Sequence, residues 1–503
     1  MNVLLKKISF HKSGKPRRWL LRLIFKKNLT VRPFSRKLAY KKNGMIRPRF
    51  RAFTRKIEAT SPEVISANQF IREEEAILKT LLPLESIVHT WRSKSDPSKL
   101  FTKSELQKEI NKALDGTHSG IIVSVSNDNY RRVTGGVQLC IEHEEVQAKT
   151  NGFTYLQIHP WHALPRLGHI CEEPDTIINL VINGNDLGCS RMSTLISVVH
   201  GFDEARIEIV IHHMLGHLPE QITELIQASR RESCLFWLHD FFSICPSYTL
   251  QRNKLSYCGA PAVDSNSCEL CVFGKERVSH SLRMESFFRS NHIKIISPSE
   301  VTAKFWLSKS NLIFESLVVI PHVSLKFLPR ASISKIVNPE PIRIAYLGAP
   351  VRHKGWTVFA DLVAEFAESD YQFIVMSQKS PEIDFVDWTN VTVTANEPNA
   401  MSESVSNNQV DLVLHWPTWP ETFSFTTFEA LAGAAYVITN PGSGNVAAAV
   451  QETGRGIILD DEEALFEFFR SNAARKLAEG RREENSTTEV IQNRSRMSFD
   501  SLN

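Results

Sequence analysis

Two glutamates in the second half of the chain, Glu421 and Glu429, stand eight residues apart. At roughly 100° per residue they would lie about 80° apart around a single helix, so we expect one in a loop and one inside the following helix. We predict that helix over 424–431, with Ser424 as its N-cap. A helix N-terminus favours phosphate, and a carboxylate accepts hydrogen bonds from sugar hydroxyls. A ligand that carries both phosphate and sugar fits this pattern.

The elements that position these glutamates follow from two series of short apolar runs that alternate with helical spacing. The first series predicts strands at 121–125, 155–158, 176–182, 205–211, 234–238 and 293–296, and the second at 342–347, 373–376, 391–393, 412–414 and 435–439. Pro339 and Pro341 mark a linker between the two series. We therefore predict an α/β fold of two Rossmann-like lobes with a central cleft.

The domain boundaries come from shifts in composition. We expect a basic N-terminal arm over 1–60, a helical connector over 61–117, a first lobe over 118–337, a second lobe over 338–473 and a polar tail over 474–503. A Cys-rich insertion over 240–274 interrupts the first lobe. No apolar run approaches the roughly 20 residues of a bilayer-spanning helix, and no secretory signal is recognisable. We expect a cytoplasmic protein.

The net charge of +4 hides a strong asymmetry. Residues 1–60 hold 19 Lys and Arg against Glu58, so the arm carries 19 − 1 = +18 and the remainder (59 − 19) − (55 − 1) = −14. Leu, Ile, Phe and Trp are interspersed with these charges, a composition that suits anionic lipid headgroups. Docking on the acidic body and binding to nucleic acid are the alternatives, of which nucleic acid is the least favoured.

The segment Glu421-Thr-Phe-Ser-Phe-Thr-Thr-Phe-Glu429 resembles the Glu-x7-Glu signature of retaining GT-B glycosyltransferases of the family 4 type. Lys354-Gly355, after the strand at 342–347, resembles the phosphate site of that family. The resemblance implies that Glu421 contacts the donor sugar, Glu429 holds the nucleotide ribose and Lys354 binds the diphosphate. The family's Arg is replaced by Ala349, and Arg352 is the substitute.

Two motifs in the first lobe resemble motifs of the same family. Gly135-Gly136 resembles its glycine loop beside the donor, although a plain strand-to-helix turn has the same pattern. His239, in Trp237-Leu-His-Asp240, resembles the histidine that faces the donor sugar, and strand ends of this kind face the ligand. Three further histidines, His212, His213 and His217, suggest a metal only superficially. We expect them to be hydrogen-bonded.

Four of the eight cysteines fall in the insertion: Cys245, Cys258, Cys268 and Cys271. The segment has many turn residues and little core of its own, so a tetrahedral zinc site built from the four thiolates would fix it. A reduced or partly disulfide-linked cluster is the alternative, and redox catalysis is the remote one. The sequence around it resembles an insertion of bacterial surface-polysaccharide glycosyltransferases.

The resemblance implies a hexosyltransferase-type enzyme that moves a sugar from a nucleotide-sugar to an acceptor hydroxyl, with retention and without a divalent metal. Together with the arm, it predicts a lipid-linked glycan acceptor, a role in lipopolysaccharide or O-antigen synthesis, and a peripheral position on the inner face of the cytoplasmic membrane. A catalytically silent GT-B scaffold and a polyanion-binding protein led by the arm are the rival hypotheses.

Overall fold

The computed structural model describes residues 97–114, 120–202, 206–329, 341–394, 396–494 and 498. These residues belong to one compact unit, Leu82–Asn503. The basic arm, most of the connector and the end of the predicted tail lie outside the described residues. Among the residues described, no helix is long and apolar enough to cross a membrane.

The first lobe forms around an eight-stranded sheet with the order β10-β9-β6-β5-β1-β2-β3-β4. Its strands are β1 (Gly120–Val125), β2 (Phe153–Pro160), β3 (Ile177–Ile182), β4 (Asn185–Arg191), β5 (Arg206–Ile211), β6 (Cys234–Trp237), β9 (Ile293–Ser297) and β10 (Ser316–Val319). Six of them are parallel, whereas β3 and β4 pair antiparallel at one edge. Every residue of β1 and β2 is buried, as expected of strands covered on both faces.

The helices of the first lobe are α6 (Lys103–Leu114), α7 (Gly136–Thr150), α8 (Met192–His200), α9 (Pro219–Ala228), α11 (Gly274–Ser290) and α12 (Glu300–Lys309). α6 falls in the predicted connector, yet Leu106 and Ile110 on it are buried in the core of the first lobe. The Cys-rich insertion holds only β7 (Gln251–Arg252), β8 (Ser256–Tyr257) and α10 (Asn266–Glu269).

The second lobe is built on a six-stranded, all-parallel sheet with the order β14-β13-β12-β15-β16-β17. The strands are β12 (Ile342–Leu347), β13 (Tyr371–Ser377), β14 (Asp387–Asn390), β15 (Leu412–Leu414), β16 (Tyr436–Thr439) and β17 (Gly456–Ile458). Its helical elements are η3 (Arg352–Lys354), α13 (Trp356–Phe366), α14 (Ala400–Asn407), α15 (Phe425–Ala432), α16 (Asn445–Thr453), α17 (Glu462–Arg470) and α18 (Ala473–Thr487). The strand expected at 391–393 is wrong, because the chain pairs as β14 just before it.

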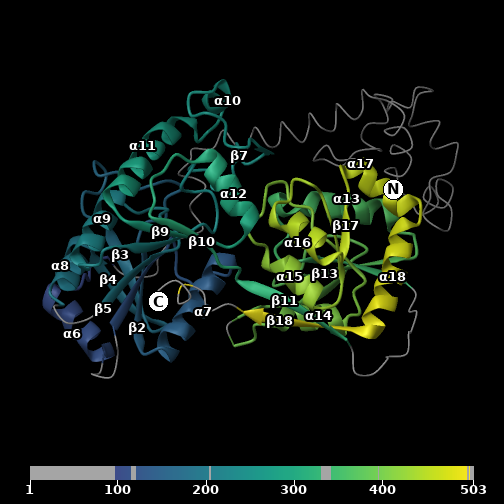
Figure 1. Cartoon of the computed structure of the whole chain (residues 1–503), viewed down its shortest axis with the longest axis horizontal. Helices are drawn as coiled ribbons and strands as arrows, with labels where there is room; N and C mark the ends of the chain where they lie inside the picture. The colour runs from purple at the N-terminus through teal and green to yellow at the C-terminus, as the bar shows by residue number, and fades with distance from the viewer. Residues whose placement is uncertain are drawn as a thin grey trace, which may run out of the picture. The chain divides into compact units, whose positions relative to one another are not determined.

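The two lobes of the predicted α/β fold are therefore confirmed, each with its own sheet, mainly parallel in the first lobe and all-parallel in the second, and with cores on both faces. Figure 1 shows the first lobe in purple to teal and the second in green to yellow. The central cleft stays a prediction. What the structure describes between the lobes is a set of direct contacts, including a 2.6 Å hydrogen bond from Thr422 Oγ1 to the carbonyl of His239.

The segment expected to be a polar tail is part of the second lobe. After α18, β18 (Thr488–Arg494) pairs antiparallel with β11 (Val323–Pro329), and the two strands run side by side in Figure 1. Arg481 and Arg482 of α18 bind the buried Asp411 at 2.7–2.8 Å. Two of the charged residues of the expected polar tail are thus partners of a buried carboxylate.

Candidate active site

Glu421 lies in the loop before α15 and Glu429 lies inside that helix, as the sequence predicted. Both side chains belong to buried residues. Glu421 Oε1 accepts a hydrogen bond from Trp419 Nε1 at 3.1 Å. Its backbone is bonded on both sides to the following turn, through the Ser443 carbonyl at 3.2 Å and the Asn445 N–H at 2.9 Å. The loop carboxylate is thereby held at the start of the helix.

Gly444 is required for that attachment. Its φ is +65°, and a Cβ at this position would lie 2.6 Å from the carbonyl oxygen of Glu421. No L side chain fits so close to backbone. The glycine turn after β16 therefore fixes the position of Glu421.

Ser424 occupies the residue before α15, as predicted, but it does not cap the helix with its side chain. Its φ is +69°, a conformation that favours glycine. Its hydroxyl instead contacts His415 Nε2 and Thr427 Oγ1, each at 3.0 Å. The small side chain thus ties β15 to the first turn of α15.

Glu429 is a buried carboxyl group close to two cations. Burial raises the pKa of Glu429 to about 7, while the charges of Arg494 and Lys354 act to lower it. A carboxyl group with a pKa near neutrality can both donate and accept hydrogen bonds, which suits a partner such as a ribose diol.

Lys354 ends η3 and is followed by Gly355, whose φ is +84°. A Cβ at Gly355 would lie 2.2 Å from the carbonyl oxygen of Trp416, so the Lys-Gly step allows η3 to approach the loop after β15. The pKa of His415 is lowered to about 3, mainly by burial and in addition by the charge of Lys354. The charge of Lys354 thus acts on both His415 and Glu429.

Arg352, the predicted substitute for the family's arginine, is exposed. Besides Lys354, the cation whose charge acts on Glu429 is Arg494, at the end of β18, and the charge of Glu429 in turn acts to raise the pKa of Arg494. Its Nη2 donates to the Pro398 carbonyl at 2.5 Å. Sequence reasoning missed Arg494 because it treated this segment as a polar tail.

The glycine loop of the first lobe lies against α15 of the second. Gly135 is the N-cap residue of α7, and a Cβ at Gly136 would contact the Phe425 ring at 3.6 Å. Gly135 has an extended backbone that any residue could adopt. The structure therefore places both glycines beside the helix that carries Glu429.

His239 follows β6 at the carboxyl edge of the first sheet. Its Nε2 is 2.9 Å from His212 Nδ1, and its carbonyl accepts the hydrogen bond from Thr422, next to Glu421. Burial and the neighbouring histidines hold the pKa of His239 well below its ordinary value, so the ring is neutral. The loop of Glu421 and the loop of His239 are thus in direct contact.

The histidines after β5 are hydrogen-bonded, as expected. His213 Nε2 is 2.9 Å from Asp240 Oδ2, and His217 Nε2 is 2.7 Å from the carbonyl of Ser126. His212 Nε2 is 3.0 Å from Glu144 Oε1. None of the three is in a metal-like group among the residues described.

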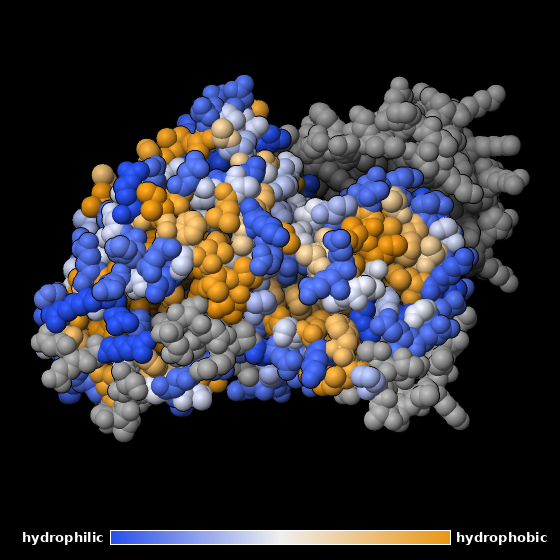
Figure 2. All heavy atoms as spheres, in the orientation of Figure 1, coloured by the Kyte–Doolittle hydropathy of each residue, from blue (hydrophilic) through white to orange (hydrophobic). Residues whose placement is uncertain are grey.

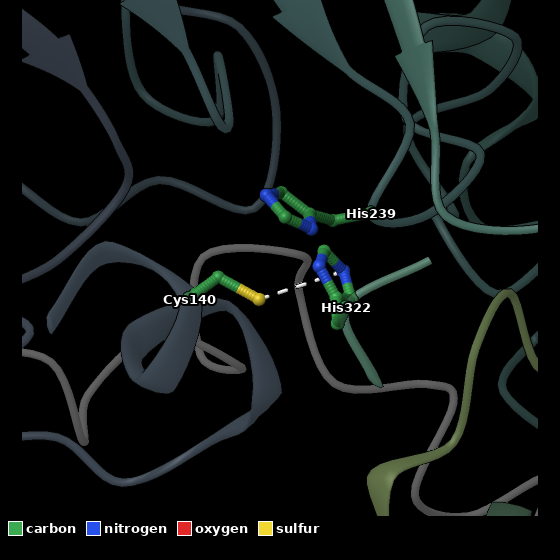
Figure 3. Close-up of side chains that lie close together, drawn as sticks. All are labelled: Cys140, His239 and His322. Carbon is green, nitrogen blue, oxygen red and sulfur yellow. Dashed lines mark hydrogen bonds between the residues drawn. The ribbon is translucent and has the colours of Figure 1, made fainter. Parts of the chain in front are cut away.

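One group with metal-ligand spacing occurs in the described part of the chain: Cys140, His239 and His322, whose ligand atoms lie within 4.8 Å of one another (Figure 3). Cys140 Sγ and His322 Nε2 are 3.5 Å apart. The two histidine rings are nearly parallel, with centroids 5.5 Å apart and planes inclined by 23°. The two rings belong to a larger aromatic cluster, because Trp237 stacks on His239 and Phe425 stacks on His322.

The four cysteines of the insertion line one small cavity together with Arg277. All four are free thiols. No three of their sulfur atoms lie within 4.8 Å of one another in the part of the chain that is described. Cys258 Sγ donates to the Leu250 carbonyl at 3.0 Å, and Arg277 Nη1 lies 2.8 Å from Cys268 Sγ. The thiols face one space without forming a closed metal site, and the zinc site stays a prediction.

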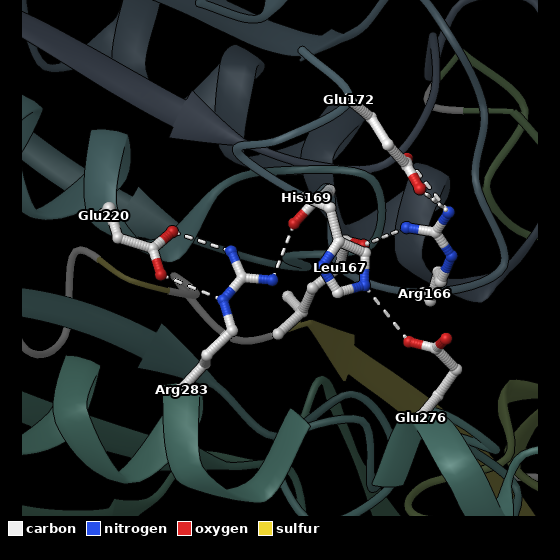
Figure 4. A network of polar contacts seen from close by, with 8 residues as sticks. Arg166, Leu167, His169, Glu172, Glu220, Glu276 and Arg283 are labelled. Atoms are coloured by element: carbon white, nitrogen blue, oxygen red, sulfur yellow. Dashed lines mark hydrogen bonds and ion pairs between the residues drawn. The ribbon is translucent and has the colours of Figure 1, made fainter. Parts of the chain in front are cut away.

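A larger cavity, about 470 Å³, lies at the loops that follow β2 and β5 of the first lobe. His162, His169, Glu172 and Glu173 contribute to its lining. Figure 4 shows that this loop contacts α11, where His169 Nε2 lies 3.3 Å from Glu276 Oε2, and that Arg283 links α11 to α9. Arg283 of α11 binds Glu220 at 2.7 Å and the Gly168 carbonyl at 2.6 Å. No motif in the sequence predicts this cavity.

No protein-family model and no curated protein matches the chain. Among solved structures it is similar to HepE of Anabaena in complex with UDP-glucose, with 12% identity, a TM-score of 0.43 and coverage of 73% of this chain and 93% of that one. It is also similar to WaaG, a glycosyltransferase involved in lipopolysaccharide biosynthesis, with 12% identity, a TM-score of 0.40 and coverage of 72% and 94%. A UDP-forming α,α-trehalose-phosphate synthase from Burkholderia vietnamiensis has 11% identity, a TM-score of 0.40 and coverage of 73% and 93%.

Proposed function

We propose that this protein is a retaining glycosyltransferase that moves a sugar from a nucleotide-sugar to a hydroxyl group of an acceptor. The observation that carries the proposal is the arrangement at α15: Glu421 before the helix, Glu429 within it, and Lys354 close enough to lower the pKa of Glu429. A cation and two carboxylates around one helix N-terminus suit a ligand with both phosphate and hydroxyl groups.

In this proposal the developing charge of the nucleoside diphosphate leaving group is stabilised by Lys354 and the N-terminus of α15. Glu429 accepts hydrogen bonds from the ribose, and Glu421 orients the donor sugar. Arg494, whose charge acts to lower the pKa of Glu429, is the second cation of the proposed site and takes the role that was expected of Arg352. No side chain is assigned as a nucleophile, and no divalent metal is given a role.

The acceptor side of the proposal rests on the cavity beside His162 and Glu173. It lies in the first lobe, at the carboxyl edge of the sheet where His239 is also found. Its histidines and glutamates offer hydrogen-bonding partners for a glycan. A lipid-linked glycan of a lipopolysaccharide or O-antigen type is the proposed acceptor, with the protein at the inner face of the cytoplasmic membrane.

The experiment that tests the proposal is a thermal-shift and hydrolysis screen of the full chain against UDP-, GDP-, ADP- and dTDP-sugars. We expect stabilisation by one donor class, which Glu429→Ala and Lys354→Ala abolish while both variants stay folded. Glu403→Ala, at an exposed carboxylate of α14, is the matched control and should bind as the wild type does. Full binding in both site variants would refute the site, and a protein that no nucleotide-sugar stabilises would instead be a silent scaffold.

Retention and independence of metal have their own readouts. The proposal expects turnover without added Mg²⁺ or Mn²⁺ and a product whose anomeric configuration by NMR equals that of the donor. Inversion, or loss of activity that Mg²⁺ or Mn²⁺ restores, would contradict these two parts while leaving glycosyl transfer intact.

A further inference from the structure

A buried chain of polar side chains leads from the interior of the first lobe to His239. It begins at Glu144 on α7, which is fully buried. Glu144 Oε1 accepts from Tyr155 Oη at 2.9 Å and lies 3.0 Å from His212 Nε2, while Oε2 accepts from the Ser498 hydroxyl. Both oxygens of this carboxyl group are therefore acceptors for neighbouring donors.

The partners in these hydrogen bonds indicate where the protons lie on two histidine rings. His212 Nε2 faces a carboxylate oxygen, so it carries a proton and donates it. A neutral His212 then has an unprotonated Nδ1, which accepts from His239 Nε2–H at 2.9 Å. The two ring planes are inclined by only 11°, so the N–H of one ring can point along the lone pair of the other. The neutral form adds no further charge to a cluster that also contains His322.

On this basis we propose that Glu144 and His212 are positioning residues that hold His239 as its Nε2–H tautomer, with Nδ1 left as a hydrogen-bond acceptor. This inference rests on the proposed function for its substrate, because His239 is the residue expected to face the donor sugar. His239 is only partly buried, whereas His212 is 3% exposed and Glu144 is 0% exposed. The buried pair can therefore act on a ligand only through His239.

The packing around His239 supports an orienting role. Its ring lies parallel to Trp237, with centroids 5.1 Å apart and planes inclined by 8°, and near-parallel to His322. The Trp237 indole N–H is itself held by Ser498 Oγ at 2.8 Å, and that same hydroxyl donates to Glu144. One carboxylate thus anchors both the hydrogen-bonded and the stacked neighbours of His239.

An unprotonated Nδ1 on His239 favours a sugar that has a hydrogen-bond donor at the facing position. A hydroxyl group can donate to Nδ1, whereas a carboxylate, a fluorine or a missing hydroxyl cannot. A site built to hydrogen-bond a hydroxyl discriminates strongly against analogues without it, because its polar group is left unpaired. The inferred donor is therefore a sugar with a free hydroxyl at the position facing His239, not a uronic acid oxidised there.

The direct test is the tautomer of His239 in the full chain without ligand. Protein labelled with ¹⁵N-histidine is measured by long-range ¹H–¹⁵N correlation, and the signal missing from His239→Gln identifies the residue. We expect the Nε2–H form in the wild type. We expect it also in His212→Asn, whose Oδ1 can replace the acceptor Nδ1 of His212, and a change of the tautomer ratio in His212→Phe.

The matched control is His280→Phe, which removes another buried histidine whose Nε2 is 2.6 Å from the Phe242 carbonyl, outside the chain to His239. It should leave the His239 signal unchanged. An Nδ1–H form in the wild type, or an unchanged signal in His212→Phe, would overturn the proposal. Because this measurement needs no donor, it stands even if no nucleotide-sugar binds.

The functional readout separates positioning from simple loss of structure. With UDP-glucose as the probe, or the donor that the screen selects, His212→Phe should lower kcat/KM about tenfold, the expected effect of one lost hydrogen bond. His212→Asn should recover most of that loss. Donor analogues that each lack one hydroxyl group are then compared. For the analogue without the hydroxyl that faces His239, kcat/KM should be the same in His212→Phe as in the wild type. Equal losses with every analogue would mean that His212 has only a structural role.

Discussion

Glu429 combines full burial with a pKa of about 7, and this predicts a pH-dependent stability. Its pKa in the folded state is raised above the unfolded value of 4.5. A group of this kind contributes stability below pH 4.5 that is lost as the pH rises through about 7. The difference between the two pKa values corresponds to about 3 kcal/mol in the free energy of unfolding.

We therefore expect the free energy of unfolding of the wild type to fall between pH 5 and pH 8 by about 3 kcal/mol more than that of Glu429→Gln. Urea unfolding at both pH values measures the difference. Glu403→Ala, at the exposed carboxylate of α14, should follow the wild type. Parallel pH profiles for wild type and Glu429→Gln would show that the carboxyl group stays ionised throughout.

At the residue scale, what the sequence predicted well was local. Glu421, Glu429 and the Lys354-Gly355 step lie within one lobe, next to strands and helices whose patterns are readable. What it missed comes from distant segments: the charge of Arg494 in β18 acts on Glu429, and Glu144 is connected to His239 through His212. No spacing rule relates such residues, because the tertiary fold alone brings them together.

The Cys-rich insertion contains four cysteines beside a buried arginine, so its stability depends on whether the cysteines bind a metal ion. Arg277 is buried beside Cys268 Sγ, and its Nε lacks a hydrogen-bond partner among the described residues. A buried guanidinium group is stabilised by nearby negative charge, which four thiolates around one zinc ion would supply. Burial otherwise raises the pKa of Cys245 to about 12, which keeps that thiol protonated without a metal.

We predict that the purified protein carries one zinc ion per chain by elemental analysis. Cys268→Ser and Cys271→Ser should lose it and melt at a lower temperature. Cys171→Ser, at an exposed cysteine outside the insertion, should retain it. If the protein contains no metal, and neither zinc nor a chelator changes its melting temperature, the zinc prediction is wrong and the cysteines form a reduced cluster.

The C-terminal helix α18 shows why element boundaries were harder to predict than element types. Asp411, next to β15, accepts hydrogen bonds from Arg481, Arg482 and the backbone N–H of Arg343. From the sequence, a run of charges after residue 473 indicates a solvated segment. The charge pattern does not show that two of those arginines form ion pairs with one buried aspartate.

Asp411→Ala should therefore destabilise the protein by about 3–5 kcal/mol, because it leaves two largely buried arginines without their partner. Chemical unfolding with a tryptophan fluorescence readout measures the change. Asp460→Ala, at an exposed aspartate of the same lobe, should cost less than about 0.5 kcal/mol. Similar effects of the two substitutions would mean that α18 contributes little to the stability of the second lobe.

At the scale of the whole molecule, charge and surface hydropathy point to the same partner. The sequence carries +18 over residues 1–60 and −14 over the remainder. The described surface mixes polar and apolar side chains, and Figure 2 shows apolar ones over α11 as well as in larger areas elsewhere on this face. On that helix Val278 and Leu282, four residues apart, are 51% and 63% exposed. A basic arm and an exposed apolar face together suit an anionic membrane surface better than either does alone.

Deleting residues 1–60 should accordingly release the protein from vesicles that contain anionic lipid, because most of the attraction is electrostatic. Sedimentation with vesicles of phosphatidylcholine and phosphatidylglycerol measures it, and binding of the full chain should weaken as salt rises. Val278→Ser with Leu282→Ser should cause a smaller loss that salt does not change, whereas Glu403→Ser should cause none. Continued pelleting of the deletion variant would refute the role of the arm, and equally tight binding of the full chain to RNA would favour a general polyanion site. If release occurs while nucleotide-sugar binding is unchanged, the arm locates the enzyme and the two lobes perform the transfer.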